Sequence, residues 1–145
     1  MTTMGSVIDE ASFLNIAIAE SLRLQFPEIN CLKPQQVTAI TNFLLRRDVF
    51  AVLPTGYGKS LIFQIIPHIS SRMATCGFNY PYKPILLVIS PLVSLIKSHI
   101  HELNDHGISC VWLSGEDADE NAIINGEFSI VFASPESIIK NEKWR

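Results

Sequence analysis

The chain has 145 residues, which is enough for one domain with a hydrophobic core and too few for two ordinary domains. Hydrophobic residues make up 48% of it and charged residues 17%, a composition that excludes intrinsic disorder. The net charge of −3 excludes a general basic field for nucleic acid, although a few lysines and helix ends can still bind phosphates locally.

Cysteine usage and the N-terminal region bear on the cellular compartment. Three widely spaced cysteines form no C-x-x-C pair, so the sequence supports neither a zinc site nor a disulfide framework. No basic residue precedes Arg23, which argues against a secretory or mitochondrial leader. The longest apolar run, residues 84–96, is interrupted by Ser90, Pro91 and Ser94 and is too short for a membrane span. We therefore expect a soluble intracellular protein, in the nucleus or the cytoplasm.

The first predicted element is an amphipathic helix in the N-terminal segment, residues 1–27. Apolar residues recur there at helical spacing, acidic residues precede them, and Pro27 follows. This pattern predicts a packing helix from Asp9 to about Phe26. We take residues 28–145 as the part of the chain that carries the function.

A second helix is predicted from Val37 to Arg47, and Gln36 stands at its start. A glutamine amide can pair with adenine N6 and N7, as it does when glutamine reads adenine in DNA. Taken alone, a glutamine at the start of a helix is a solvated residue. An adenine-binding role for Gln36 therefore requires a nucleotide site nearby.

The next stretch has the pattern of a strand, a glycine turn and a helix. Residues 48–53 are predicted to form a buried strand, and Lys59 and Ser60 open an apolar helical pattern that Pro67 ends or kinks. Glycines in the turn allow backbone N–H groups to surround an anion. The lysine can reach the β and γ phosphates, and the serine hydroxyl can hold Mg²⁺. The stretch therefore predicts a nucleoside triphosphate site.

The strict phosphate-loop pattern, G-x-x-x-x-G-K-[ST], is not met at its first position. It requires glycine where this chain has Leu53. The alternative is a plain glycine turn beside a solvated lysine. The apolar run before the turn and the amphipathic pattern after it favour the phosphate loop, because they are the context that the motif requires.

Three further strands are predicted at residues 85–89, 110–113 and 130–133. A helix is expected after the first of them, as far as about His106. The acidic residues that follow the second are most simply a solvated loop or a helix start. Strands that alternate with helices and are apolar on both faces predict a parallel α/β sheet.

Two of these strands end in a Ser-Pro turn. Ser90 and Ser134 are placed to cap a helix, with Pro91 and Pro135 as its first residue. In a parallel sheet such helix ends lie at the carboxyl edge, where these folds bind ligands and where free N–H groups face anions. Ordinary capping explains either turn alone. With a phosphate loop at the same edge, the two turns suggest a second row of phosphates, such as a nucleic acid backbone.

These motifs, in this order, resemble the first half of a helicase motor domain, and most closely that of the RecQ family of superfamily-two DNA helicases. Residues 32–36 are similar to motif 0, residues 53–60 to motif I in its helicase form, where the first glycine is commonly absent, residues 90–95 to motif Ia, and residues 134–136 to motif Ib. The resemblance implies a P-loop NTPase of α/β class, with a RecA-like parallel sheet flanked by helices and incomplete after motif Ib.

The resemblance also implies ATP-driven translocation on single-stranded DNA in the 3′-to-5′ sense, with unwinding of duplex. ATP and Mg²⁺ would be the cofactors and single-stranded or forked DNA the partner, with RNA left open and a nuclear location favoured. The residues implied to bind ATP are Lys33, Gln36, Thr55, Gly56, Tyr57, Gly58, Lys59 and Ser60, with Lys59 acting on the transferred phosphoryl group and Ser60 on Mg²⁺. Those implied to bind DNA are Ser90, Pro91, Leu92, Ser94, Ser134, Pro135 and Glu136.

The sequence departs from the family pattern at two places near these motifs. Ser98 and His99 follow Lys97 where the family often has Asp-Gln, which weakens the DNA-contact assignment there. Tyr57 replaces a frequent glycine and is expected to place an exposed ring over the loop.

A larger departure is the Asp-Glu-x-His segment, whose aspartate holds Mg²⁺ and whose glutamate orients the attacking water in the family. No such segment follows motif Ib before Arg145, and Asp119 and Glu120 precede that motif and cannot replace it. The second lobe is missing as well, and its arginine finger is worth roughly 10³ to 10⁵ in rate in related NTPases. We therefore expect these residues to bind nucleotide without turnover, as the N-terminal part of a helicase whose C-terminal part completes the motor.

Two other interpretations remain open at this point. The chain could be a genuine short protein that binds ATP or single strands without catalysis. A small-molecule kinase is a third possibility, disfavoured by the Ser-Pro turns. Under the helicase interpretation, the strand before the phosphate loop would lack a neighbour that the family takes from later sequence, so an open apolar edge predicts aggregation of the isolated chain.

Overall fold

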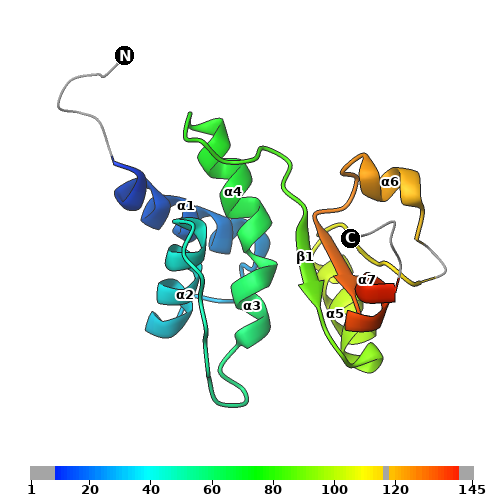
Figure 1. Cartoon of the computed structure of the whole chain (residues 1–145). Coiled ribbons are helices and arrows are strands. Elements are labelled where there is room, and N and C mark those ends of the chain that lie inside the picture. Colours follow the sequence, from blue (N-terminus) through cyan, green and yellow to red (C-terminus); the bar gives the residue numbers. More distant parts are fainter. Residues whose placement is uncertain (1–8, 116–117, 141–145) are drawn as a thin grey trace. The chain divides into compact units, whose positions relative to one another are not determined.

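The computed structural model describes residues 9–115 and 118–140, and its elements are labelled in Figure 1. The chain forms a helical unit that ends at Tyr82 and an α/β unit that begins at Lys83. In chain order the elements are α1 (Glu10–Gln25), α2 (Pro34–Leu44), α3 (Lys59–Gln64), α4 (Ile66–Thr75), β1 (Leu86–Ile89), α5 (Val93–Asp105), β2 (Cys110–Trp112), α6 (Glu120–Ile124), β3 (Ile130–Ala133) and α7 (Pro135–Lys140).

The helix α1 confirms the prediction for the N-terminal segment. The carboxylate of Asp9 accepts a hydrogen bond of 2.7 Å from the Ser12 N–H, which is the geometry of a helix N-cap and lowers the pKa of Asp9. At the other end the Phe26 N–H bonds to the Leu22 carbonyl, and Pro27 follows. Local signals at both ends therefore fix this helix.

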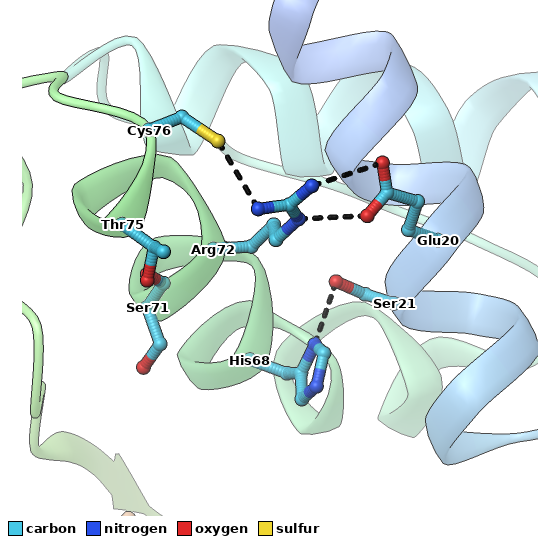
Figure 2. A network of polar contacts seen from close by, with 7 residues as sticks. All are labelled: Glu20, Ser21, His68, Ser71, Arg72, Thr75 and Cys76. Atoms are coloured by element: carbon cyan, nitrogen blue, oxygen red, sulfur yellow. Dashed lines mark hydrogen bonds and ion pairs between the residues drawn. The ribbon is translucent and has the colours of Figure 1, made fainter.

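Packing of α1 against α4 joins the first and last helices of the helical unit. Figure 2 shows the polar side of this contact, where Arg72 Nε donates to Glu20 Oε2 at 2.7 Å and His68 Nδ1 lies 2.8 Å from Ser21 Oγ. The hydrogen bond from Arg72 lowers the pKa of Glu20, and burial lowers that of His68. The core beneath is apolar and includes Leu14, Ile18, Leu22, Ile65, Ile69 and Met73.

The helix predicted after the glycine turn is interrupted, as expected from its proline. The first helix, α3, ends at Gln64 and α4 begins at Ile66, with Pro67 in its first turn. Proline has no N–H to donate and fits the first turn of a helix, where that donor would be unsatisfied anyway. Pro67 therefore divides one predicted helix into two.

The predicted strand at residues 48–53 is not formed. These residues have neither helix nor strand geometry, and the side chains of Phe50 and Val52 are 94% and 79% exposed. A strand requires a neighbour that pairs with its N–H and C=O groups. Within residues 9–115 and 118–140, no backbone hydrogen bond supplies one. Apolar composition alone therefore predicted the wrong local structure here.

The α/β unit contains the predicted parallel sheet, with three strands in the order β1-β3-β2. The central strand β3 is buried along its whole length. On one face the ring of His99, from α5, stacks on Phe132 with 5.8 Å between the ring centroids. On the other face Val131 packs with Val111 and with Ile123 of α6. Helices therefore cover both faces of β3, as predicted.

The edge strand β1 differs from the prediction that all strands are buried on both faces. Leu87 and Ile89 are 48% and 51% exposed. By register Leu87 stands beside Val131, but α6 covers Val131 together with Val111 of β2. An apolar strand at the edge of the sheet is therefore covered on one face only.

Two general features complete the fold. The three cysteines, Cys31, Cys76 and Cys110, are free, and burial raises the pKa of the Cys110 thiol to about 11. None of the helices placed by the structure is long and apolar enough to cross a membrane.

Candidate nucleotide-binding site

The glycine turn and the helix after it have the predicted geometry. The Tyr57 N–H bonds to the Pro54 carbonyl at 3.2 Å, which closes the turn. Gly56 and Gly58 have φ angles of 82° and 89°, a region that glycine enters without steric cost. Gly58 is the N-cap of α3, and no side chain caps that helix. The first N–H groups of α3 are therefore not consumed by a cap.

Motif 0 lies directly against this turn. Gln36, only 4% exposed, directs its amide nitrogen to the carbonyl oxygens of Gly58 at 2.9 Å and Tyr57 at 3.3 Å. Its amide oxygen accepts the Lys33 N–H at 2.8 Å, which satisfies a free donor at the start of α2. Two motifs that the sequence linked only by resemblance are thus joined by hydrogen bonds.

The adenine contact of Gln36 stays a prediction. Bidentate pairing with adenine uses one amide hydrogen and the amide oxygen. In this structure the amide nitrogen of Gln36 is shared between two loop carbonyls. Gln36 holds the loop here. The helix α2 also begins at Pro34, earlier than predicted, because proline suits its first position and Gln36 completes the cap.

Tyr57 is also placed differently from the prediction. Its ring is half-buried, and the ammonium group of Lys33 lies 4.4 Å from the ring centroid. The same ammonium donates to the Tyr57 carbonyl at 3.1 Å, and the tyrosine hydroxyl donates to the Gln35 side-chain oxygen. The ring is therefore packed against motif 0. Sequence reasoning missed Gln35, and only its position beside Gln36 could have indicated it.

Three polar side chains of the turn and of the start of α3 have no partner among the described residues: those of Thr55, Lys59 and Ser60. Lys59 and Thr55 are exposed and Ser60 is half-buried. In the part of the chain that the structure describes, their side chains make no hydrogen bond or ion pair. An unpaired ammonium suits phosphate oxygens, and an unpaired hydroxyl suits Mg²⁺, which takes few protein ligands and otherwise binds water and substrate phosphates. The described residues hold no cluster of three acidic, histidine or cysteine side chains for a metal cage.

The Ser-Pro turn at residue 90 is not the predicted helix cap. The helix α5 begins at Val93 with Leu92 as N-cap, and Ser90 Oγ accepts the Leu92 N–H at 3.3 Å. The Ser90 N–H bonds to the Ala133 carbonyl at 2.9 Å and so extends the sheet ladder by one residue. The Ser90 hydroxyl is used in a turn with Leu92, two residues on, and the helix begins only after Leu92.

The Ser-Pro turn at residue 134 is the predicted cap. The helix α7 begins at Pro135, and Ser134 Oγ accepts the Ser137 N–H at 3.3 Å. The Ser137 hydroxyl returns a hydrogen bond of 2.9 Å to the Ser134 carbonyl. Since β1 and β3 are parallel neighbours that end at paired residues, Ile89 and Ala133, both turns lie at one edge of the α/β unit.

The residues predicted to contact DNA fall on these two turns. The hydroxyl of Ser94 and the side chains of Pro91, Leu92 and Glu136 are exposed, whereas Ser90, Ser134 and Pro135 are half-buried. Exposed hydroxyls can donate to phosphate oxygens, and the apolar side chain of Leu92 can pack on a sugar. The carboxylate of Glu136 repels phosphate, so at this edge it suits a sugar hydroxyl or a base donor.

Comparison with known proteins follows the same motifs. Residues 33–145 match the family described as DEAD/DEAH box helicase. The chain is 33% identical over 117 residues to the ATP-dependent helicase SGS1 of Saccharomyces cerevisiae, covering 77% of this chain and 8% of the yeast protein. It is 29% identical over 118 residues to the ATP-dependent DNA helicase Q1 of Rattus norvegicus, covering 76% and 17%. It is 32% identical over 112 residues to the ATP-dependent DNA helicase RecQ of Haemophilus influenzae, covering 73% and 16%. The chain thus spans 8% to 17% of the length of these relatives.

Proposed function

Because the chain belongs to the DEAD/DEAH box helicase family, we propose that residues 33–60 are the ATP-binding portion of a RecQ-like DNA helicase. The matches to proteins named RecQ and Q1 confirm the resemblance predicted from the motifs, and the parallel sheet is that of an incomplete RecA-like fold. One observation carries the proposal. Gln36 is hydrogen-bonded to the glycine turn at 2.9 Å, and the side chains of Lys59 and Ser60, which follow Gly58, have no partner among the described residues.

Each residue of the site would bind a different part of the nucleotide. The Tyr57 N–H closes the turn, so the phosphates would bind the backbone N–H groups of Thr55, Gly56 and Gly58. Lys59 would add a positive charge beside the transferred phosphoryl group. Ser60 would hold Mg²⁺, which neutralises charge on the β and γ phosphates when it is bound. The resemblance assigns Lys33 to the base end of the site. In the structure its ammonium group donates to the Tyr57 carbonyl and lies over the Tyr57 ring.

We also propose that these 145 residues bind ATP without hydrolysing it. Phosphoryl transfer depends on positioning and on charge stabilisation of the transition state. The printed sequence contains a phosphate loop but no Asp-Glu-x-His segment to orient the attacking water. Hydrolysis, 3′-to-5′ translocation and unwinding would then be activities of a longer protein that contains this segment, for which we propose a nuclear location.

In the α/β unit we propose a single-strand contact at the edge formed by the two Ser-Pro turns. Ser90, Pro91, Leu92 and Ser94 would lie along one stretch of backbone, and Ser134, Pro135 and Glu136 along the next. Hydroxyl and backbone donors read phosphate and sugar without base information, so the contact suits DNA and RNA alike. Filter binding of matched DNA and RNA oligonucleotides to Ser94→Glu tests this edge, with Asn125→Glu, at an exposed position outside both turns, as control. Equal affinity in both variants would remove the assignment.

The nucleotide site is tested by titration calorimetry of the chain with Mg²⁺ and ATP. Lys59→Ala should abolish binding, whereas Lys83→Ala, which removes another exposed lysine outside the site, should leave the affinity unchanged. Unchanged affinity in Lys59→Ala would refute the assignment of the site. Phosphate release above background that Lys59→Ala removes would refute the absence of turnover.

A further inference from the structure

Tyr57 lies between the two glycines of the loop and is the only one of the three residues with a side chain. Gly56 and Gly58, at φ angles of 82° and 89°, give this stretch more backbone freedom than any other residue type would. A loop of this kind holds one shape only if something outside its own backbone fixes it. The contacts that do so converge on residue 57.

The side chain of Tyr57 is held through its hydroxyl and through the face of its ring. Its hydroxyl donates to the Gln35 side-chain oxygen, and the Lys33 ammonium lies 4.4 Å from the ring centroid. An ammonium over an aromatic face is attracted by the negative face of the ring. Both partners stand at the start of α2, 22 and 24 positions away in sequence.

The backbone of Tyr57 is held by the same segment. Its carbonyl oxygen accepts from Lys33 Nζ at 3.1 Å and from the Gln36 amide nitrogen at 3.3 Å. Lys33 therefore contacts this residue twice, through the ring and through the carbonyl. The polar groups of α2 that the resemblance would assign to the base are here bonded to the loop.

We propose that Tyr57 is a positioning residue that fixes the phosphate loop against the start of α2, so that the loop is shaped for phosphate before the nucleotide arrives. The inference rests on the proposed nucleotide function and specifies how that site is preorganised. Because a preformed site does not lose loop freedom on binding, it binds more tightly. The benefit falls on the phosphates and not on the base, since the ring and the hydroxyl are both used within the protein.

The experiment compares Mg²⁺-ATP with Mg²⁺-tripolyphosphate, which offers the same phosphates without a base, by calorimetry on the full chain. Tyr57→Gly should weaken both ligands by the same factor, roughly tenfold, because a lost cation–π contact and hydrogen bond together correspond to about one decade in affinity. Tyr57→Phe keeps the ring beside Lys33 and loses only the hydrogen bond to Gln35, so it should weaken both ligands about threefold. Tyr82→Gly removes an exposed tyrosine outside the site and should change neither affinity.

A second pair of variants tests the cation. Lys33→Arg keeps a cation that can lie over the ring and should retain most of the tripolyphosphate affinity, whereas Lys33→Met should lose as much as Tyr57→Gly. Circular dichroism first shows that each variant is folded. If Lys33 served only overall stability, the folded Lys33→Arg and Lys33→Met chains would bind tripolyphosphate equally well.

Several outcomes would overturn the inference. Weakening confined to ATP, with tripolyphosphate unchanged, would mean that Tyr57 contacts the base. Wild-type affinity for both ligands in Tyr57→Gly would mean that the loop keeps its shape without the Tyr57 side chain. A wild-type chain that binds ATP but not tripolyphosphate would mean that the loop alone gives no measurable phosphate affinity. In each of these cases the proposed function stands if Lys59→Ala abolishes ATP binding. A wild-type chain that binds neither ligand would instead refute the proposed function.

Discussion

The amide nitrogen of Gln36 lies 2.9 Å from the carbonyl oxygen of Gly58, so a buried glutamine on α2 fixes the residue that opens α3. A Cβ atom at position 58 would lie 2.5 Å from that nitrogen, and the φ angle there is +89°. Glycine is therefore required at this position by its backbone conformation and by its neighbour. The strict phosphate-loop pattern places glycine here, and in this chain the requirement has a named physical cause.

Gly58→Ala should destabilise the chain more than Gly77→Ala does. Both residues have positive φ, so each substitution costs about 1–2 kcal/mol in the backbone. A Cβ at Gly77 meets nothing within 4 Å, whereas one at Gly58 displaces the Gln36 amide and breaks its hydrogen bonds, at about 1 kcal/mol further. Urea denaturation measures the two free energies of unfolding. In a chain that already carries Gln36→Ala, the cost of Gly58→Ala should be closer to that of Gly77→Ala. Equal losses in the two single variants would contradict this account.

Acid should weaken the helical unit through His68. Burial lowers the pKa of this histidine below 6.5, and the nearby charges of Arg72 and Glu20 act in opposite directions with the Arg72 effect larger. As pH falls through 6.5, the unfolded chain gains a proton that the folded chain resists, so stability decreases until the folded-state pKa is passed. Melting temperatures between pH 7.5 and 5.5 should fall less in His68→Gln, which can keep the hydrogen bond to Ser21. The same slope in both proteins would argue that His68 is not responsible.

Alkali should weaken the same unit through Tyr80. Burial, with smaller contributions from the hydrogen bond to Glu10 and from its charge, raises the pKa of Tyr80 from 10.0 to about 12. The Tyr80 hydroxyl lies 2.9 Å from a Glu10 oxygen and 3.0 Å from the Leu44 carbonyl. The unfolded chain loses this proton above pH 10 while the folded chain retains it, so stability falls as pH rises from about 10 to about 12. Tyr80→Phe should cost about 1 kcal/mol at pH 8 and show a smaller loss in alkali. The alkaline loss would have another origin if Tyr80→Phe leaves it unchanged.

Leu87→Lys should reduce self-association of the isolated chain. Leu87 is 48% exposed on β1, an edge strand whose only described strand partner is β3. Exposed apolar edge strands pair with other chains, and a lysine on the edge opposes this. Light scattering at increasing protein concentration compares the variant with Leu24→Lys, a substitution at a 61% exposed leucine on α1. If Leu87→Lys and Leu24→Lys reduce aggregation equally, the added positive charge and not the exposed edge strand β1 would be the cause.

The sequence predicted best the features whose causes lie within a few residues. Asp9 starts α1, Pro67 divides the helix after the loop, and Ser134 caps α7, each through contacts to residues at most three positions away or through the proline itself. The parallel sheet was also predictable, because strands β2 and β3 carry continuous apolar runs. Boundaries of these elements agree with the prediction to within a few residues.

The failures share a physical cause, which is dependence on a distant partner. Residues 48–53 have the composition of a strand, yet a strand forms only beside a neighbour. Ser90 has the residue type of a helix cap, yet its N–H bonds to the Ala133 carbonyl of the neighbouring strand and α5 begins only at Val93. An exposed ring was expected at Tyr57, whereas Lys33 and Gln35 contact it from more than twenty positions away. In the candidate site, residue types were predictable and their mutual contacts were not.

The sheet order has a consequence for the timing of folding during synthesis. Among the described strands β1 and β2 pair only with β3, which is the last of the three to leave the ribosome. At the usual 5–20 residues per second, Ile89 waits roughly 2 to 9 s before Ala133, its partner in the ladder, has been made. The helical unit has all its elements by Tyr82 and faces no such delay. The nascent chain therefore carries an apolar, unpaired β1 for seconds behind a finished helical unit, and this interval is when a chaperone would be most useful to it.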